Sequence, residues 1–99
     1  MYIDFHTHRC LHHRDSLEIV SVHPGKQIPG PYYTTGFHPW WQTSSLTPEQ
    51  VFFLKNEIKE KGCLGIGECG LDKLKGAPLE TQMCVFEQHI SIANEAECP

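Results

Sequence analysis

Residues 63–72, CLGIGECGLD, are the stretch that decides the fold. The apolar segment 63–67 predicts a short strand bounded by turn residues, and Glu68 follows it directly. In an extended chain Leu64, Ile66 and Glu68 share one face, which places the carboxylate at the C-terminal end of this strand. The flanking glycines let a ligand approach closely. A carboxylate there is placed to bridge two divalent ions, but an exposed glutamate in a glycine-rich turn explains this segment equally well.

The same stretch contains a glycine pattern that imitates a dinucleotide-binding motif. Gly65, Gly67 and Gly70 spell GxGxxG. We reject this interpretation because a helix should open at the third glycine, whereas residues 71–78 predict a loop. Glu68 would also place a negative charge beside the pyrophosphate, where helix N–H groups are needed.

The elements around this strand favour an α/β fold. Earlier strands are predicted at residues 2–5, 17–22 and 32–37, and a helix is predicted on each side of the strand 63–67. Strand–helix–strand–helix order in the second half implies parallel strands joined by crossover helices. This order suits part of an α/β barrel or an open α/β sheet, in one domain that spans residues 1–99.

Both helices carry signals for their ends or their buried face. Thr47 is the expected N-cap of the first helix, with Pro48 at its first position and Gln50 completing a capping box. Gly62 is expected to end this helix in the left-handed conformation. The second helix is expected to begin near Leu79. Two adjacent apolar stripes predict a wide buried face on it, namely Leu79, Met83, Phe86, Ile90 and Ala93, and Val85, His89, Ile92 and Ala96.

Composition limits the classes of protein to consider. The net charge of −4 excludes a nucleic-acid binder that relies on a basic surface, so contact with phosphate would depend mostly on bound metal. The five cysteines are an odd number without CxxC spacing, which argues against a disulfide framework and favours free thiols in a reducing cytoplasm. We expect no membrane span and no signal peptide, because the apolar runs are short and the N-terminus lacks a basic region.

A histidine-rich segment supplies the second candidate group. In the sequence Asp4-Phe5-His6-Thr7-His8, alternation along a strand puts Asp4, His6 and His8 on one face. Two imidazoles side by side at a strand end are able to bind one metal ion. An exposed loop that binds nothing is about equally consistent with this segment alone. A small non-enzymatic metal-binding module is another alternative, built on His6, His8, Cys10, His12 and His13.

The remaining histidines and the tryptophans carry weaker signals. His38 ends the third predicted strand, and a lone histidine there is more often structural than functional. Trp40 and Trp41 follow it. Their rings are able to stack on nucleobases, but packing against the barrel rim is their expected role. His12, His13 and His23 are expected in solvated loops, and His89 is expected to be structural.

Three segments taken in order resemble the TatD family of metal-dependent hydrolases. They are residues 3–8 (IDFHTH), 36–39 (GFHP) and 67–72 (GECGLD), and Gln82 and Phe86 fit the same pattern. The short loop after His8 and the His-Pro-Trp sequence are similar to the compact branch of that family. The resemblance covers nearly the whole chain, and three ordered motifs are far more specific than any one of them.

The resemblance implies a TIM-type (β/α) barrel with a site for two divalent metal ions, such as Mg²⁺, Mn²⁺ or Zn²⁺, at the C-terminal strand ends. It implies hydrolysis of DNA phosphodiester bonds by a metal-activated water. His6 and His8 would bind one ion, and Glu68 would bridge both and serve as the catalytic carboxylate. His38 and Asp72 would lie near the substrate.

The chain departs from the family in its length. A complete barrel needs eight strands and typically ~250 residues, whereas about four strands are predicted here. The family places further ligands, two histidines and an aspartate, beyond this point. Residues 1–99 would then form the N-terminal half of a barrel with a half-built metal site. The alternative function is an inactive fragment that binds metal weakly, or that assembles with a partner chain through its open sheet edges.

Overall fold

The computed structural model describes residues 1–12 and 15–99, and this part of the chain forms one parallel sheet with two helices. The strands lie in the order β1-β2-β3-β4, and each neighbouring pair is parallel. This arrangement confirms the predicted α/β class and is that of part of a TIM-type barrel. The elements are β1 (Tyr2–Thr7), β2 (Ser16–Val22), β3 (Tyr33–Thr35), α1 (Pro48–Glu57), β4 (Cys63–Ile66) and α2 (Leu79–Ala96).

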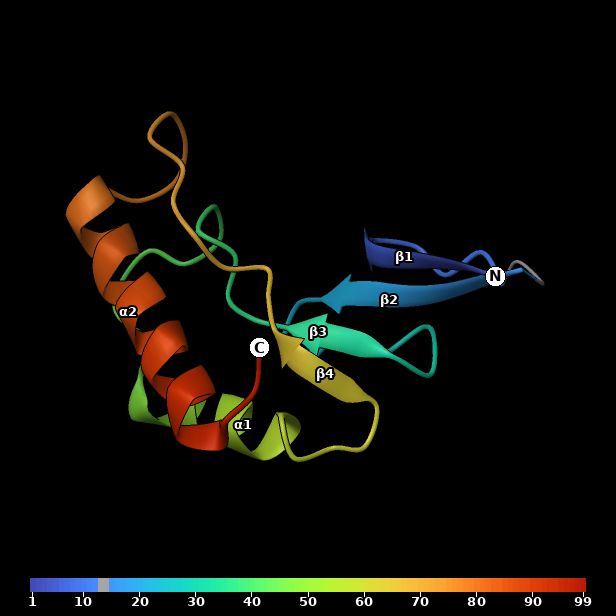
Figure 1. Cartoon of the computed structure of the whole chain (residues 1–99). Helices are drawn as coiled ribbons and strands as arrows, with labels where there is room; N and C mark the ends of the chain where they lie inside the picture. The colour runs from blue at the N-terminus through green and yellow to red at the C-terminus, as the bar shows by residue number, and fades with distance from the viewer. Residues whose placement is uncertain (13–14) are drawn as a thin grey trace.

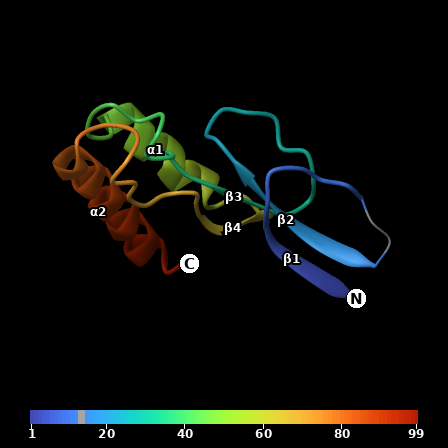
Figure 2. The same ribbon diagram turned by 90° about the horizontal axis from the view of Figure 1, so that it is seen from above.

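The two helices lie together on one side of the molecule, beside β4 and the C-terminal ends of the strands, while β1 and β2 extend away from them (Figures 1 and 2). The C-terminus returns to β4, where the carbonyl of Pro99 accepts a hydrogen bond from the N–H of Ile66 at 2.8 Å. Pro99 therefore lies beside the end of β4.

The hydrophobic core lies mainly on the side of the molecule that carries the two helices. The larger cluster of buried side chains joins the helices to the loop after β3, and consists of Phe37, Leu46, Leu54, Val85 and Ile92. Val20, Val22 and Tyr33 form a second cluster across β2 and β3. By contrast, 77% of Tyr2 and 74% of Phe5 on β1 are exposed. The β1 edge is thus the least covered part of the described sheet.

The capping box predicted for α1 is confirmed, but its predicted end is wrong. The Thr47 side chain accepts a hydrogen bond from the N–H of Gln50 at 3.2 Å, and the Gln50 side chain accepts one from the N–H of Thr47 at 2.9 Å. The helix ends at Glu57, with Ile58 as a right-handed C-cap. Gly62 lies just before β4, where a Cβ would collide with the carbonyl of Pro31. Close packing, and not a left-handed cap, explains this glycine.

Helix α2 begins at Leu79 as predicted, but its buried face is narrower than expected. The buried residues are Gln82, Val85, His89 and Ile92. The other predicted stripe is largely open, with Met83 45% and Ile90 43% exposed. The helix packs on α1 and β4 along its buried stripe only, which leaves much of the adjacent stripe in solvent. In the described part of the chain, neither helix is long and apolar enough to cross a bilayer.

Candidate metal centre

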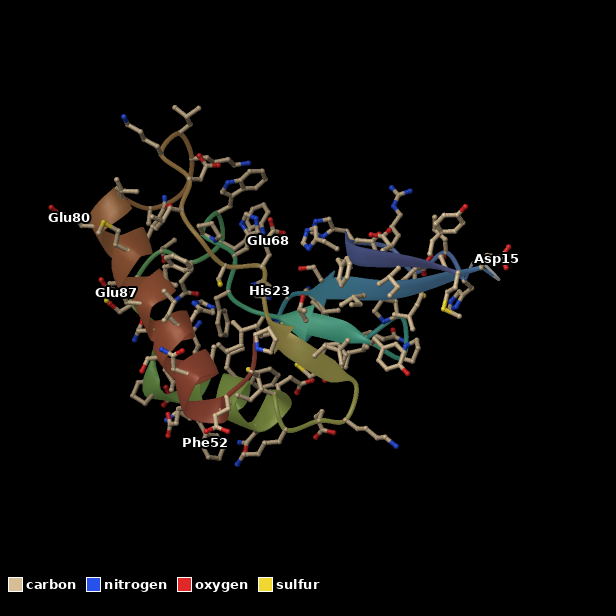
Figure 3. All side chains as sticks on the ribbon, in the orientation of Figure 1. Asp15, His23, Phe52, Glu68, Glu80 and Glu87 are labelled. Carbon is tan, nitrogen blue, oxygen red and sulfur yellow. The ribbon has the colours of Figure 1, made fainter. Side chains whose placement is uncertain are left out.

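The structure brings the histidine pair of the first strand to the glutamate that follows the fourth. His6 lies in β1 and His8 follows it, and the Nε2 atom of each ring is 3.6 Å from Oε2 of Glu68. One ligand atom from each of these three residues lies within 4.8 Å of the others. Figure 3 labels Glu68 beyond the C-terminal end of β4.

The curvature of the sheet is what makes this meeting possible. β1 and β4 occupy opposite edges of the described sheet, and in a flat sheet these edges would be ~14 Å apart. Curling of the sheet, together with the reach of the side chains, closes that gap. Converging side chains at the C-terminal mouth of a curled parallel sheet are the usual position of a barrel's functional site.

His38 lies on the other side of the Glu68 carboxylate. Its Nε2 atom is 3.5 Å from Oε1 of Glu68, and its Nδ1 atom accepts a hydrogen bond from the N–H of Trp40 at 3.1 Å. In a neutral His38 the proton is therefore on Nε2 and faces the carboxylate. The His38 side chain is 18% exposed, against 52% for that of His6. The segment after β3 thus buries this ring more than β1 buries that of His6.

Asp72 lies at the rim of the same site and is held by several hydrogen bonds. Its carboxylate accepts from the indole N–H of Trp40 at 2.7 Å and from the N–H of Leu74 at 2.8 Å. These two bonds, the first above all, lower the pKa of Asp72 below its ordinary value. Its N–H donates to the side chain of Gln82 at 2.7 Å, so α2 fixes the position of the aspartate.

A hollow of about 170 Å³ connects these groups, and its lining includes His38, Trp40, Glu68, Cys69 and Asp72. Burial, with a further contribution from the charge of Glu68, raises the pKa of the Cys69 thiol. Cys69 therefore remains protonated at neutral pH in the absence of metal. The carboxylates of Glu68 and Asp72 and the imidazole of His38 are the groups in this lining that suit a cation.

The donor set fits a divalent ion. Two imidazole nitrogens and one carboxylate are ligands that Zn²⁺, Mn²⁺ and similar ions accept, and a set of three leaves positions open for water or substrate. The two oxygens of Glu68 face different partners, with Oε2 toward His6 and His8 and Oε1 toward His38.

The other residues named from the sequence lie in different surroundings. Cys10 and His12 contact each other, with Sγ 3.5 Å from Nδ1, and among the described residues they are not part of the candidate ligand group. His13 lies outside the described residues. His23, expected in a solvated loop, is half-buried and its ring packs edge-on against Phe37. His89 is structural as expected, since it is buried between Phe37 and Val85.

Sequence reasoning missed the supporting contacts around the site. The sequence predicts packing at the rim for Trp40. In the structure the indole N–H of Trp40 donates a hydrogen bond to Asp72. The ammonium of Lys75 also lies over the Trp40 ring, with Nζ 3.9 Å from the ring centroid. Neither contact joins neighbours in sequence, so no local pattern marks them. The one available signal was composition, because two lysines follow Asp72 in an otherwise acidic chain.

The fold and the grouped side chains define a class of protein: a barrel-type α/β chain with a His/Glu group, able to hold a cation, at the C-terminal strand ends. Comparison with protein families narrows this class. The family described as TatD related DNase matches residues 6–99, and the chain belongs to that family. Comparison with curated proteins gave no significant match. Comparison with solved structures likewise gave none.

Proposed function

We propose that this chain is a TatD-type hydrolase that cleaves phosphodiester bonds of DNA, using divalent ions held by His6, His8 and Glu68. The observation that carries the proposal is the position of the Glu68 carboxylate, 3.6 Å from both imidazoles of the first strand's end. Membership of the TatD related DNase family supports the same substrate class.

Different residues of the protein bind the ions and contact the phosphate. When bound, the ions supply Lewis acidity at the phosphate and lower the pKa of a coordinated water. His6, His8 and Glu68 hold the cation side of the site. The Nε2–H of His38, 3.5 Å from Glu68, is placed to donate a hydrogen bond to a phosphate oxygen that enters the hollow.

Asp72 contributes to the site as a fixed carboxylate. Its lowered pKa keeps it ionised at neutral pH, and its bond to Trp40 sets the position of the indole at the rim. Two carboxylates beside a phosphate repel it, and the whole chain carries a net charge of −4. Attraction of the phosphate to these two carboxylates therefore depends on the divalent ions, which reverse the charge at the metal centre itself.

The experiment is degradation of linear DNA by the purified chain with added Mg²⁺ or Mn²⁺. Glu68→Gln and His6→Ala should abolish the activity, because each removes a group that holds the ions. Glu68→Gln should also weaken Mn²⁺ binding, measured by titration calorimetry, by about tenfold or more, since even outer-shell partners contribute 10- to 100-fold.

Glu60→Gln is the matched control, because it removes an exposed carboxylate from the turn between α1 and β4. It should leave DNA degradation and Mn²⁺ affinity unchanged. DNA degradation that persists in excess chelator, or that survives Glu68→Gln, would show that another protein or another site is responsible.

A second candidate function is an inactive chain that binds metal weakly or assembles with a partner. Two observations favour it: the side chains of His6 and His8 are 52% and 67% exposed, and apolar side chains of β1 are open. It predicts weak Mn²⁺ binding without turnover of any phosphodiester. Turnover that titrates with Mn²⁺ and disappears in Glu68→Gln would exclude it.

A further inference from the structure

Two tryptophans that the proposed reaction does not use follow His38 in the chain, and the ring of each packs near the His38 ring. Trp40 and Trp41 follow the C-terminal end of β3, and 40% of Trp40 and 63% of Trp41 is exposed. Trp40 is part of the lining of the hollow. Large aromatic surfaces left open at the rim of a concave site are typical of ligand-binding surfaces.

The contacts of Trp40 leave its neighbour as the available stacking surface. The indole N–H of Trp40 donates to Asp72, and the ammonium of Lys75 lies 3.9 Å from its ring centroid. Its polar atom and one face are therefore occupied. Trp41 stands edge-on to Trp40 with ring centroids 6.1 Å apart, and it is the more exposed of the two.

Lys75 adds a positive charge to this aromatic pair. Its Nζ atom is also 5.7 Å from the ring centroid of Trp41. An ammonium group beside an exposed indole is the combination by which proteins hold single-stranded nucleic acid, since the ring stacks on a base and the cation contacts a phosphate. In a chain with a net charge of −4, this local cation stands out.

We propose that Trp41 and Lys75 form a subsite for single-stranded DNA, in which an unpaired base stacks on Trp41 and the adjoining phosphate contacts Lys75. The inference rests on the proposed function, because it places the strand beside the candidate metal centre. His38 connects the two places: its ring centroid is 6.3 Å from that of Trp41, and its Nε2 is 3.5 Å from Glu68. The bases of a duplex are already paired and stacked, so a duplex has no free base that can stack on Trp41.

The test is binding of a fluorescein-labelled oligothymidylate to the full chain in excess chelator, followed by fluorescence anisotropy. Trp41→Leu should weaken binding by about tenfold or more, whereas Trp41→Phe should retain most of the affinity because it keeps an aromatic face. Lys75→Gln should weaken binding and reduce its salt dependence, since one phosphate contact is lost. Circular dichroism of each variant shows whether it is folded.

Matched controls come from the opposite side of the molecule. Phe52→Leu removes an exposed aromatic side chain of α1, which Figure 3 labels far from Glu68. Lys59→Gln removes an exposed lysine beyond the end of the same helix. Neither control should change binding of the oligothymidylate.

Comparing different DNA ligands tests the subsite independently of hydrolysis. An abasic strand of equal length and a duplex should both bind about as weakly to the wild-type chain as oligothymidylate binds to Trp41→Leu. Equal binding of the abasic strand, no binding of oligothymidylate, or unchanged affinity in folded Trp41→Leu would overturn the subsite. Normal binding in chelator without DNA cleavage on adding metal would instead overturn the proposed function.

Discussion

At the scale of single residues, His89 shows how a side chain remote from the candidate centre supports it. Its ring is 1% exposed. Nε2 accepts a hydrogen bond from the N–H of Phe37 at 2.9 Å, so the proton is on Nδ1, which donates to the carbonyl of Val85 at 2.8 Å. Phe37 immediately precedes His38. The imidazole of α2 thus fixes the backbone that carries a proposed substrate-binding side chain.

We expect His89→Leu to lower the free energy of unfolding by about 1–3 kcal/mol, because it leaves the buried N–H of Phe37 without an acceptor. Urea denaturation followed by circular dichroism measures this change. Glu87→Gln, an exposed substitution on the same helix, should change it by no more than about 0.5 kcal/mol. A His89→Leu protein as stable as the wild type would mean that water satisfies this N–H.

The same histidine predicts a pH dependence. Burial lowers the pKa of His89 below its ordinary value of 6.5. Below pH 6.5, His89 takes up a proton in the unfolded chain but not in the folded chain. The free energy of unfolding therefore keeps its full value above about pH 6.5 and falls as the pH drops toward the pKa of His89 in the folded chain. The slope is at most about 1.4 kcal/mol per pH unit. His89→Gln should remove this part of the dependence in urea titrations at several pH values. If the free energy of unfolding of His89→Gln changes with pH as in the wild type, other groups cause the dependence.

At the scale of elements, α2 shapes the loop that leads to it from β4. The Oε1 atom of the buried Gln82 side chain accepts a hydrogen bond from the N–H of Asp72 at 2.7 Å. Its Nε2 atom lies 2.7–3.0 Å from the carbonyl oxygens of Asp72, Lys75 and Ala77, which share its two N–H groups. One amide thereby satisfies several backbone groups of a loop without regular structure. The same amide sets the position of Asp72, and through it that of Trp40.

Gln82→Leu should therefore destabilise the chain by roughly 2 kcal/mol, since it leaves these backbone groups unpaired. It should also shift the tryptophan emission to longer wavelength, because Trp40 loses its fixed partner. Ser91→Ala, at an exposed position of α2, serves as the control for both measurements. Emission identical to that of the wild type would show that Asp72 keeps its position without the glutamine.

Local signals in the sequence located the elements well but not their limits. The capping box of Thr47 and Gln50 acts within one helical turn, so residues close in sequence specify it completely. The third strand was predicted at 32–37 but covers Tyr33–Thr35. It stops early because the N–H of Phe37 bonds His89 and not a neighbouring strand. That contact joins distant segments, and no local pattern predicts it.

For the candidate site, the alternation of side chains along a strand predicts His6, His8 and Glu68 at strand ends. The structure brings these three side chains together. Their role as ligands stays a prediction. The surrounding support could not be predicted, because the bond between Trp40 and Asp72 and the position of Lys75 depend on how two loops pack. Donor positions follow from strand alternation, whereas their surroundings follow from tertiary structure.

At the scale of the whole molecule, the exposed apolar side chains of β1 predict self-association. Tyr2, Ile3 and Phe5 are 77%, 53% and 74% exposed on a strand that pairs in the described sheet only with β2. An edge strand with open apolar residues favours pairing with another chain. Sedimentation velocity should show species heavier than the 11.3 kDa monomer, increasing with concentration.

Phe5→Lys should shift this equilibrium toward the monomer, because an edge lysine opposes strand pairing. Phe52→Lys, on α1, is the matched control and should leave the distribution unchanged. A wild-type chain that sediments as a monomer at every concentration would show that the exposed edge does not drive association.

The parallel order of the strands also bears on how the molecule comes together. Antiparallel neighbours can close as local hairpins, but each strand pair here must wait for an intervening segment to be arranged, which makes folding depend on distant contacts. The first strand and the residue after the fourth meet only when every pair between them has formed. If His6 and Glu68 do share an ion, its capture would report completion of the sheet, and a partly folded chain would bind it poorly however intact its helices.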